Sequence, residues 1–213
     1  MDGLSIRRRI ALDIARSMRK SQEEEHPLRQ LFWECTLRCN LRCQHCGSDC
    51  KQVAATPDMP KEDFFKVLDS IAAKTDPHKV FVIISGGEPT MRADLEECGK
   101  GIYSRGFPWG MVTNGFGITA ERFSRLLGAG LHSMTVSLDG LEENHDWLRG
   151  REGSFTRAAE TIRMAVRSGI AFDVVTCVNR RNYSQLPQLK EFLIGLGLKE
   201  WRLFPYSRKA APL

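Results

Sequence analysis

The chain has 213 residues and a formal net charge of +5, and 42% of its residues are hydrophobic and 27% charged. This length and composition are typical of one soluble globular domain with a sizeable core. No apolar run approaches the ~20 residues of a membrane span, and no basic stripe with interleaved aromatic residues indicates nucleic-acid binding.

The first predicted element is a helix over residues 4–24. Ile6, Ile10, Ala11, Ile14, Ala15 and Met18 fall on one side, and Arg8, Arg9, Arg16, Arg19 and Lys20 on the other. We expect this helix to pack against the domain; a membrane-surface or partner helix is the alternative. The acidic, proline-stopped stretch 21–27 predicts a boundary between an N-terminal helical extension, 1–26, and the domain proper, 27–213.

The second element is a strand over 31–35, followed by a loop from 36 to 58 that carries Cys39, Cys43 and Cys46 at the spacing C-x-x-x-C-x-x-C. Thiolates are soft ligands that suit iron–sulfur clusters and zinc. An all-cysteine cubane needs four thiolates, so three leave one iron open to an outside ligand. Cys35 and Cys50 lie nearby, so a structural zinc site is the alternative. Cys98 and Cys177 are expected to be buried apolar residues.

Strands and helices then alternate along the chain. Further strands are predicted over 80–84, 109–112, 132–138, 172–178 and 200–204. The continuous run of β-branched and aromatic residues over 80–84 predicts a strand buried on both faces. The intervening helices are one opened by Asp58-Met59-Pro60, then 93–104, 119–127, 154–168 and 186–196. Six such strands imply parallel βαβ units. We therefore expect an α/β fold, a partial (β/α)6 open barrel with parallel strands, because a closed eight-unit barrel typically takes about 250 residues. A doubly wound sheet is the alternative.

Candidate site residues follow the ends of these strands. After 80–84 come Gly86, Gly87 and Glu88, where the glycines allow close backbone approach and the carboxylate could bind an ammonium group. Asn114 follows the third strand, and Ser137 and Asp139 follow the fourth. Because the carboxyl ends of parallel strands meet at one edge, we expect these groups to lie together. The alternative for each is an ordinary turn residue. Asn179, after the fifth strand, is expected to be a turn former.

Together these motifs, with His145-x-x-x-Arg149-Gly150, resemble the radical S-adenosylmethionine (SAM) superfamily over roughly residues 28–206. The stretch 145–155 is most similar to the sulfatase-maturase and peptide-modifying group. Members of that group usually continue into a cysteine-rich segment for auxiliary clusters. This sequence has no cysteine after Cys177, so either it is a fragment, truncated after the sixth strand, or it lacks auxiliary clusters. The resemblance implies that Cys39, Cys43 and Cys46 bind a [4Fe–4S] cluster.

The remaining roles are implied by the same resemblance. His45 would lie near the adenine of SAM, and Gly86, Gly87 and Glu88 would hold its methionine amino group. Asn114, Ser137, Asp139 and Arg149 complete the expected set, the last three serving the ribose or carboxylate. No catalytic base is assigned.

The reaction implied is reductive cleavage of SAM to a 5′-deoxyadenosyl radical, which abstracts hydrogen from a peptide or protein side chain. The alternatives are an enzyme acting on a small-molecule cofactor precursor and a non-enzymatic metal-binding module. The expected partners are a peptide or small-molecule substrate and an electron donor such as flavodoxin or ferredoxin. The odd number of cysteines and the absence of a visible leader favour the cytoplasm.

Overall fold

Six parallel strands form one open sheet in the order β1-β2-β3-β4-β5-β6 in the computed structural model, which describes residues 5–48, 50 and 52–205. The strands are β1 (Gln30–Glu34), β2 (Phe81–Ser85), β3 (Trp109–Thr113), β4 (Leu131–Ser137), β5 (Ala171–Val178) and β6 (Trp201–Pro205). β1 and β6 are the two edges and each pairs with one neighbour in the described part of the chain. The open parallel α/β fold is thus confirmed.

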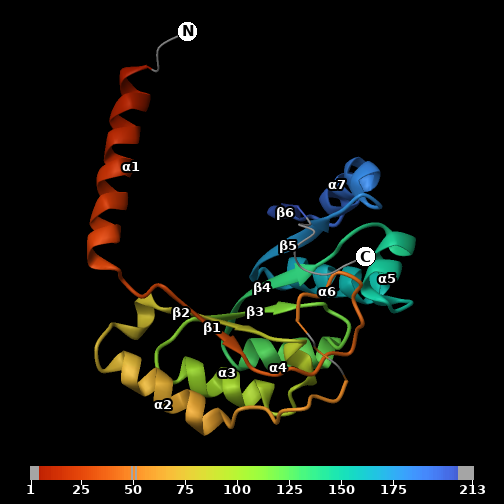
Figure 1. Ribbon diagram of the computed structural model, residues 1–213, viewed down its shortest axis with the longest axis horizontal. Coiled ribbons are helices and arrows are strands. Elements are labelled where there is room, and N and C mark those ends of the chain that lie inside the picture. Colours follow the sequence, from red (N-terminus) through yellow and green to blue (C-terminus); the bar gives the residue numbers. More distant parts are fainter. Residues whose placement is uncertain (1–4, 49, 51, 206–213) are drawn as a thin grey trace.

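Helices connect successive strands. They are α2 (Lys61–Ala72), α3 (Leu95–Tyr103), α4 (Ala120–Gly128), α5 (Glu142–Arg149), α6 (Ser154–Ser168) and α7 (Leu186–Gly195), with short 3-10 turns at Pro77–Lys79, Pro89–Met91 and Tyr183–Gln185. Figure 1 shows α2, α3 and α4 on one side of the strands. The core lies between the connecting helices and the sheet. Leu68 of α2, Leu95 of α3 and Ile162 of α6 are fully buried in it.

The expectation that residues 80–84 form a strand buried on both faces is wrong. Val82 and Ile84 are fully buried, whereas Phe81, Ile83 and Ser85 are half-buried. Successive strand side chains point to opposite faces. The helices cover the outer face of β2, and its inner face stays partly open.

Helix α1 (Ile6–Glu25) does not pack against the domain, contrary to expectation. Every residue of α1 whose side chain the structure describes is exposed, and Figure 1 shows the helix projecting away from the sheet. His26 ends it in the left-handed region at φ 43°, and Pro27 follows. This terminator turns the chain into β1. The division at residues 26 and 27 stays a prediction, and residues 1–4 and 206–213 lie outside the described part.

The sequence reading missed α5. Its end signals were present: Glu142 and Glu143 are in the first turn, Arg149 is in the last, and Gly150 caps it in the left-handed conformation at φ 64°.

Within the described residues, no helix is both long and apolar enough to cross a membrane.

Candidate active site

A cavity of about 950 Å³ lies at the carboxyl ends of the strands. The predicted site residues that line it are Cys39, Cys43, His45, Cys46, Gly86, Gly87, Glu88, Asn114, Ser137 and Arg149. Cys50 and Ser85 line it as well. The volume is within the range of small-molecule and cofactor sites. The fold thus brings together groups from the ends of β2, β3 and β4, the end of α5 and the cysteine loop.

The two glycines after β2 hold the start of the cysteine loop. Gly87 N–H donates to Thr36 O at 2.8 Å, and Glu88 N–H donates to Arg38 O at 2.9 Å. A Cβ on Gly86 would lie 2.3 Å from Thr36 O, and one on Gly87 would lie 2.4 Å from Arg38 O. No side chain fits in such contacts, so both positions require glycine.

The end of α5 holds the middle of the same loop. Arg42 N–H donates to Arg149 O at 3.2 Å, and Gln44 N–H donates to Leu148 O at 2.7 Å. A Cβ on Gly150 would meet Arg42 O at 2.3 Å. The cysteine loop is therefore held by the turn after β2 at its start and by the end of α5 at its middle, two segments that lie far apart in the sequence.

Asp58 closes the base of the cysteine loop. Its carboxylate accepts from Thr36 Oγ1 at 2.7 Å and forms an ion pair with Arg38. These contacts join residues about 20 positions apart, so the long connection after β1 begins and ends at one point.

Donors face two of the three motif cysteines. Arg149 Nη1 lies 3.7 Å from Cys43 Sγ, and Asn114 Nδ2 lies 4.0 Å from Cys39 Sγ. Burial raises the pKa of Cys39 to about 11, and burial also raises that of Cys43 although Arg149 opposes the rise. These thiols are therefore protonated at neutral pH until a metal displaces the protons.

Glu88 is a buried carboxylate that joins two strand ends. Oε1 accepts from Thr90 N–H at 3.1 Å, Thr90 Oγ1 at 2.8 Å and Thr113 Oγ1 at 2.8 Å. Oε2 accepts from Asn114 N–H at 2.7 Å. An oxygen with one bond retains capacity for another donor, so Oε2 is the atom of Glu88 suited to a ligand ammonium group.

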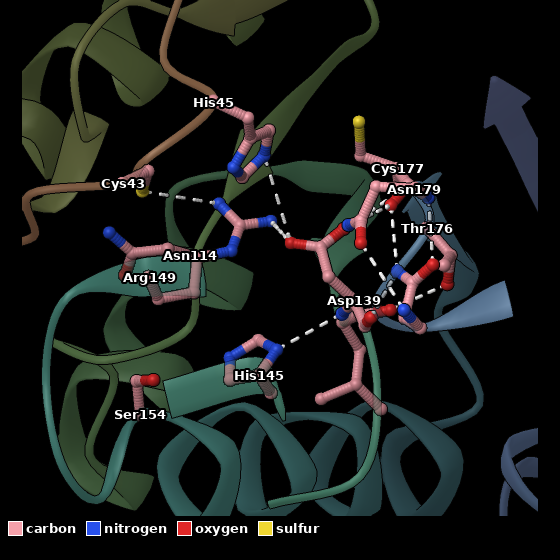
Figure 2. A network of polar contacts seen from close by, with 12 residues as sticks. Cys43, His45, Asn114, Asp139, His145, Arg149, Ser154, Thr176, Cys177 and Asn179 are labelled. Atoms are coloured by element: carbon pink, nitrogen blue, oxygen red, sulfur yellow. Dashed lines mark hydrogen bonds and ion pairs between the residues drawn. The ribbon is translucent and has the colours of Figure 1, made fainter. Parts of the chain in front are cut away.

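Asp139 is the centre of a buried charged network (Figure 2). Its Oδ2 lies 2.6 Å from Arg149 Nη2 and 3.8 Å from His45 Nε2, and its Oδ1 accepts from Cys177 N–H at 2.7 Å. Burial, with the charge of Arg149, lowers the pKa of His45. Asp139 does not line the cavity. Its carboxylate faces Arg149 and His45, which do line the cavity, so Asp139 contacts other protein residues and not the cavity itself.

His145 joins this network through the backbone of Asp139. Its Nδ1 accepts from Asp139 N–H at 3.0 Å, which places the proton of the neutral ring on Nε2. Burial, reinforced by Arg149, lowers the pKa of His145 to about 4. The ring is therefore neutral at physiological pH and fixes the backbone at the end of β4.

The cysteines outside the motif differ from each other. Cys35 is buried in the core, where burial raises its pKa to about 12, and Cys98 is also buried as expected. The expectation of a buried Cys177 is wrong, since it is half-buried beside Asp139. Asn179 accepts from Arg181 N–H at 2.9 Å, which confirms the turn role expected of it.

The donor set fits an iron–sulfur cluster with an attached polar cofactor. Among the described residues, no three His, Cys, Asp or Glu side chains converge as ligands of one metal ion do. Cubane thiolates each bind a different iron, so three separate thiols around a cavity satisfy that demand. Within the described part of the chain, His45 Nδ1 is buried at the cavity and lacks a protein partner, which suits a ligand bearing hydrogen-bonding atoms.

The family model described as "Radical SAM superfamily" matches residues 33–193, well over half of the chain. An Fe-coproporphyrin III synthase from Methanosarcina barkeri is 32% identical over 76% of this chain and 40% of its own length. A PqqA peptide cyclase from Methylocella silvestris is 28% identical over 79% of this chain and 45% of its own. The chain thus spans about half the length of the curated relatives it matches.

Solved structures agree on the fold. SuiB from Streptococcus suis, in a crystal structure with bound S-adenosylmethionine, superimposes with a TM-score of 0.72 at 18% identity, over 98% of this chain and 48% of that one. The structure titled anSMEcpe with bound AdoMet has a TM-score of 0.72 at 18% identity over 85% of this chain and 52% of that one. At such identities the likeness concerns the open parallel sheet and its helices.

Proposed function

This chain belongs to the radical SAM superfamily, whose enzymes use a [4Fe–4S] cluster and SAM, and from that premise we propose how its own residues serve the two cofactors. Cys39, Cys43 and Cys46 are the cluster ligands, and SAM binds in the cavity beside them. The observation that carries this proposal is that the three thiols, Glu88 and Arg149 all line the same cavity.

The cluster, when bound, supplies the electron that cleaves SAM to methionine and a 5′-deoxyadenosyl radical able to abstract hydrogen from a substrate. The chain's own work is to place ligands and exclude water. The Gly86-Gly87 turn and the end of α5 hold the backbone of the cysteine loop, through the hydrogen bonds at Thr36, Arg42 and Gln44.

The polar groups of the cavity divide the recognition of SAM among themselves. Glu88 Oε2 and the nearby main-chain carbonyls are the proposed acceptors for the ammonium group. Ser137, the cavity-lining hydroxyl at the end of β4, is the proposed partner of the ribose or carboxylate, and His45 that of the adenine. Asp139 and Arg149 are then proposed to act through their mutual ion pair, which positions Arg149 at the cavity.

The proposed substrate is a peptide or protein side chain. The motif run from His145 to Phe155 supports this class, as does the similarity to PqqA peptide cyclases at 28% identity. A tetrapyrrole-type cofactor precursor is the second candidate, because the Fe-coproporphyrin III synthase and an AdoMet-dependent heme synthase from the same organism reach 32% and 30% identity. We also propose a cytoplasmic location and a flavodoxin- or ferredoxin-type electron donor.

The test is turnover of the anaerobically reconstituted chain with SAM and dithionite, with 5′-deoxyadenosine as product. We expect slow cleavage without substrate. Loss of cleavage in Cys43→Ala, with retention in Cys98→Ala, supports the assignment. A protein with a full cluster that neither binds nor cleaves SAM would overturn it. Fe-coproporphyrin III and candidate precursor peptides, added separately, then distinguish the substrate classes by which one accelerates cleavage.

A further inference from the structure

Helix α1 carries an apolar stripe that nothing in the described structure covers. Ile6, Ile10, Ile14 and Met18 follow one another at four-residue spacing, which places them on one side of a helix. Their exposed fractions are 77%, 54%, 55% and 59%. At a rise of 1.5 Å per residue the stripe is about 18 Å long. Burying such side chains is favourable, so an uncovered stripe of this length indicates a binding surface.

Basic residues occupy the face of α1 opposite this stripe. At 100° per residue, Arg8, Arg16 and Arg19 lie about 140–160° from the centre of the stripe. Asp13 is the single acidic residue between Ile6 and Lys20, and it lies 3.4 Å from Arg16 in an exposed pair. An apolar face opposite a basic face is the pattern of a helix that lies on an anionic surface.

The position of α1 separates it from the cavity. The helix leads into the amino-terminal end of β1, whereas the cavity is at the carboxyl ends of the strands. Figure 1 shows α1 standing clear of the sheet and of its covering helices. A surface that covers α1 can thus leave the mouth of the cavity accessible.

We propose that α1 binds the surface of a membrane that contains anionic lipids. The apolar stripe enters the boundary between headgroups and acyl chains, and the long basic side chains reach lipid phosphates. An anionic lipid surface supplies the negative charge that complements this basic helix, whereas a second α1 carries the same excess of arginine. The helix lies in the interface, since it is not apolar enough to cross.

The experiment is vesicle co-sedimentation of the full chain. The vesicles are phosphatidylcholine alone or phosphatidylcholine mixed with phosphatidylglycerol. We expect binding to the mixed vesicles only, and we expect it to weaken in 1 M salt, where the screening length falls to about 3 Å. Replacing Arg8, Arg16 and Arg19 by glutamine should lower the affinity about a hundredfold, at roughly fivefold for each basic residue.

The matched variants address the stripe itself. The double variant Ile10→Glu/Ile14→Glu should lower vesicle affinity by about a hundredfold or more. The control is Ile194→Glu on α7, where the isoleucine is 57% exposed, and it should bind as the unmodified chain does. All of these side chains are exposed, so folding and SAM cleavage should be unchanged. That separates failure here from failure of the proposed function.

Two results would overturn the proposal. One is the absence of binding to mixed vesicles, or equal binding to both vesicle types. The other is a dimer in light scattering that the double variant abolishes while vesicle binding persists unchanged, which would assign the stripe to a second copy of this chain.

Discussion

Arg149 is shared between a carboxylate and a thiol: Nη2 lies 2.6 Å from Asp139 Oδ2, and Nη1 lies 3.7 Å from Cys43 Sγ. Burial alone would lower the pKa of Arg149, but Asp139 and Cys43 raise it above its usual value. The guanidinium is therefore charged whenever the site is formed. It links the proposed cluster ligand to the network at the end of β4.

We predict that Arg149→Gln makes the cluster harder to reduce. Hydrogen bonds to cluster sulfurs help set the reduction potential, and a positive charge nearby favours the more negative reduced state. Loss of one charged hydrogen bond of about 1.5–3 kcal/mol bounds the shift at roughly 60–130 mV toward negative values. Redox titration followed by electron paramagnetic resonance measures it.

The control for this variant is Arg181→Gln. Arg181 bonds Asn144 and Glu143 at the other end of α5, away from the cavity. It should leave both iron content and potential unchanged. Equal potentials in Arg149→Gln and the unmodified chain, at equal iron content, would contradict a role for Arg149 at the cluster.

The glycine turn gives a prediction about folding. A methyl group on Gly87 would lie 2.4 Å from Arg38 O, which is backbone and cannot rotate away. We expect Gly87→Ala to displace the cysteine loop, to lower the free energy of unfolding by about 1–3 kcal/mol, and to reduce iron loading. Thermal unfolding and iron per chain measure the two effects.

Gly128→Ala is the matched control, because nothing lies within 4 Å of a Cβ at that position in α4. Alanine favours a helix over glycine by up to about 1 kcal/mol, so this variant should be as stable as the unmodified chain or more so. If both alanine variants load iron equally, the Gly87 turn does not position the cysteines.

Much of this site follows from the sequence because parallel strands end at one edge. The positions of Gly86, Asn114 and Ser137 at the cavity needed only the order of strands and the loops after them. The reason for the glycines did not follow, since it depends on the carbonyl groups of Thr36 and Arg38, which belong to another strand end. Sequence spacing holds no information on such contacts.

Helix α5 and helix α1 show two other limits. α5 has eight residues and mostly polar character, so its hydrophobic period was weak and only its end signals marked it. For α1 the pattern was plain, but a pattern gives the faces of a helix and not what covers them. Whether a stripe is buried depends on the direction in which the chain turns after the helix. Here His26 and Pro27 lead the chain into β1 and leave α1 projecting away from the domain (Figure 1).

His145 gives a prediction about pH. Burial lowers the pKa of His145 to about 4 in the folded chain, so its ring stays neutral there at pH 5. In the unfolded chain the same ring takes up a proton as pH falls through about 6.5. The contribution of His145 to the free energy of unfolding is fully present above pH 6.5. It is lost as pH falls toward 4, by about 3 kcal/mol in all. Urea unfolding at pH 7 and pH 5 should show the decline.

His145→Gln should flatten that decline, because glutamine can accept from Asp139 N–H through its carbonyl oxygen and takes up no proton. The exposed His132 supplies the control, and His132→Gln should keep the pH dependence of the unmodified chain. An unchanged slope in His145→Gln would mean that the acid sensitivity arises elsewhere.

The last prediction separates cluster ligands from neighbouring cysteines. Cys39, Cys43 and Cys46 line the cavity at the motif spacing, whereas Cys35 is buried in the core with its pKa raised to about 12. Cys50 also lines the cavity and lies against the Gly87 turn, so position alone does not separate it from the three. The separation rests on chemistry, because a fourth thiolate on the cluster would occupy the iron that SAM needs. We therefore expect Cys39→Ala, Cys43→Ala and Cys46→Ala each to lose the cluster and all cleavage of SAM, and Cys35→Ala and Cys50→Ala to keep both. Iron per chain and 5′-deoxyadenosine yield after anaerobic reconstitution decide this. Loss of iron in Cys50→Ala as complete as in Cys43→Ala, with circular dichroism unchanged, would instead indicate a four-thiolate site and a metal centre closed to SAM.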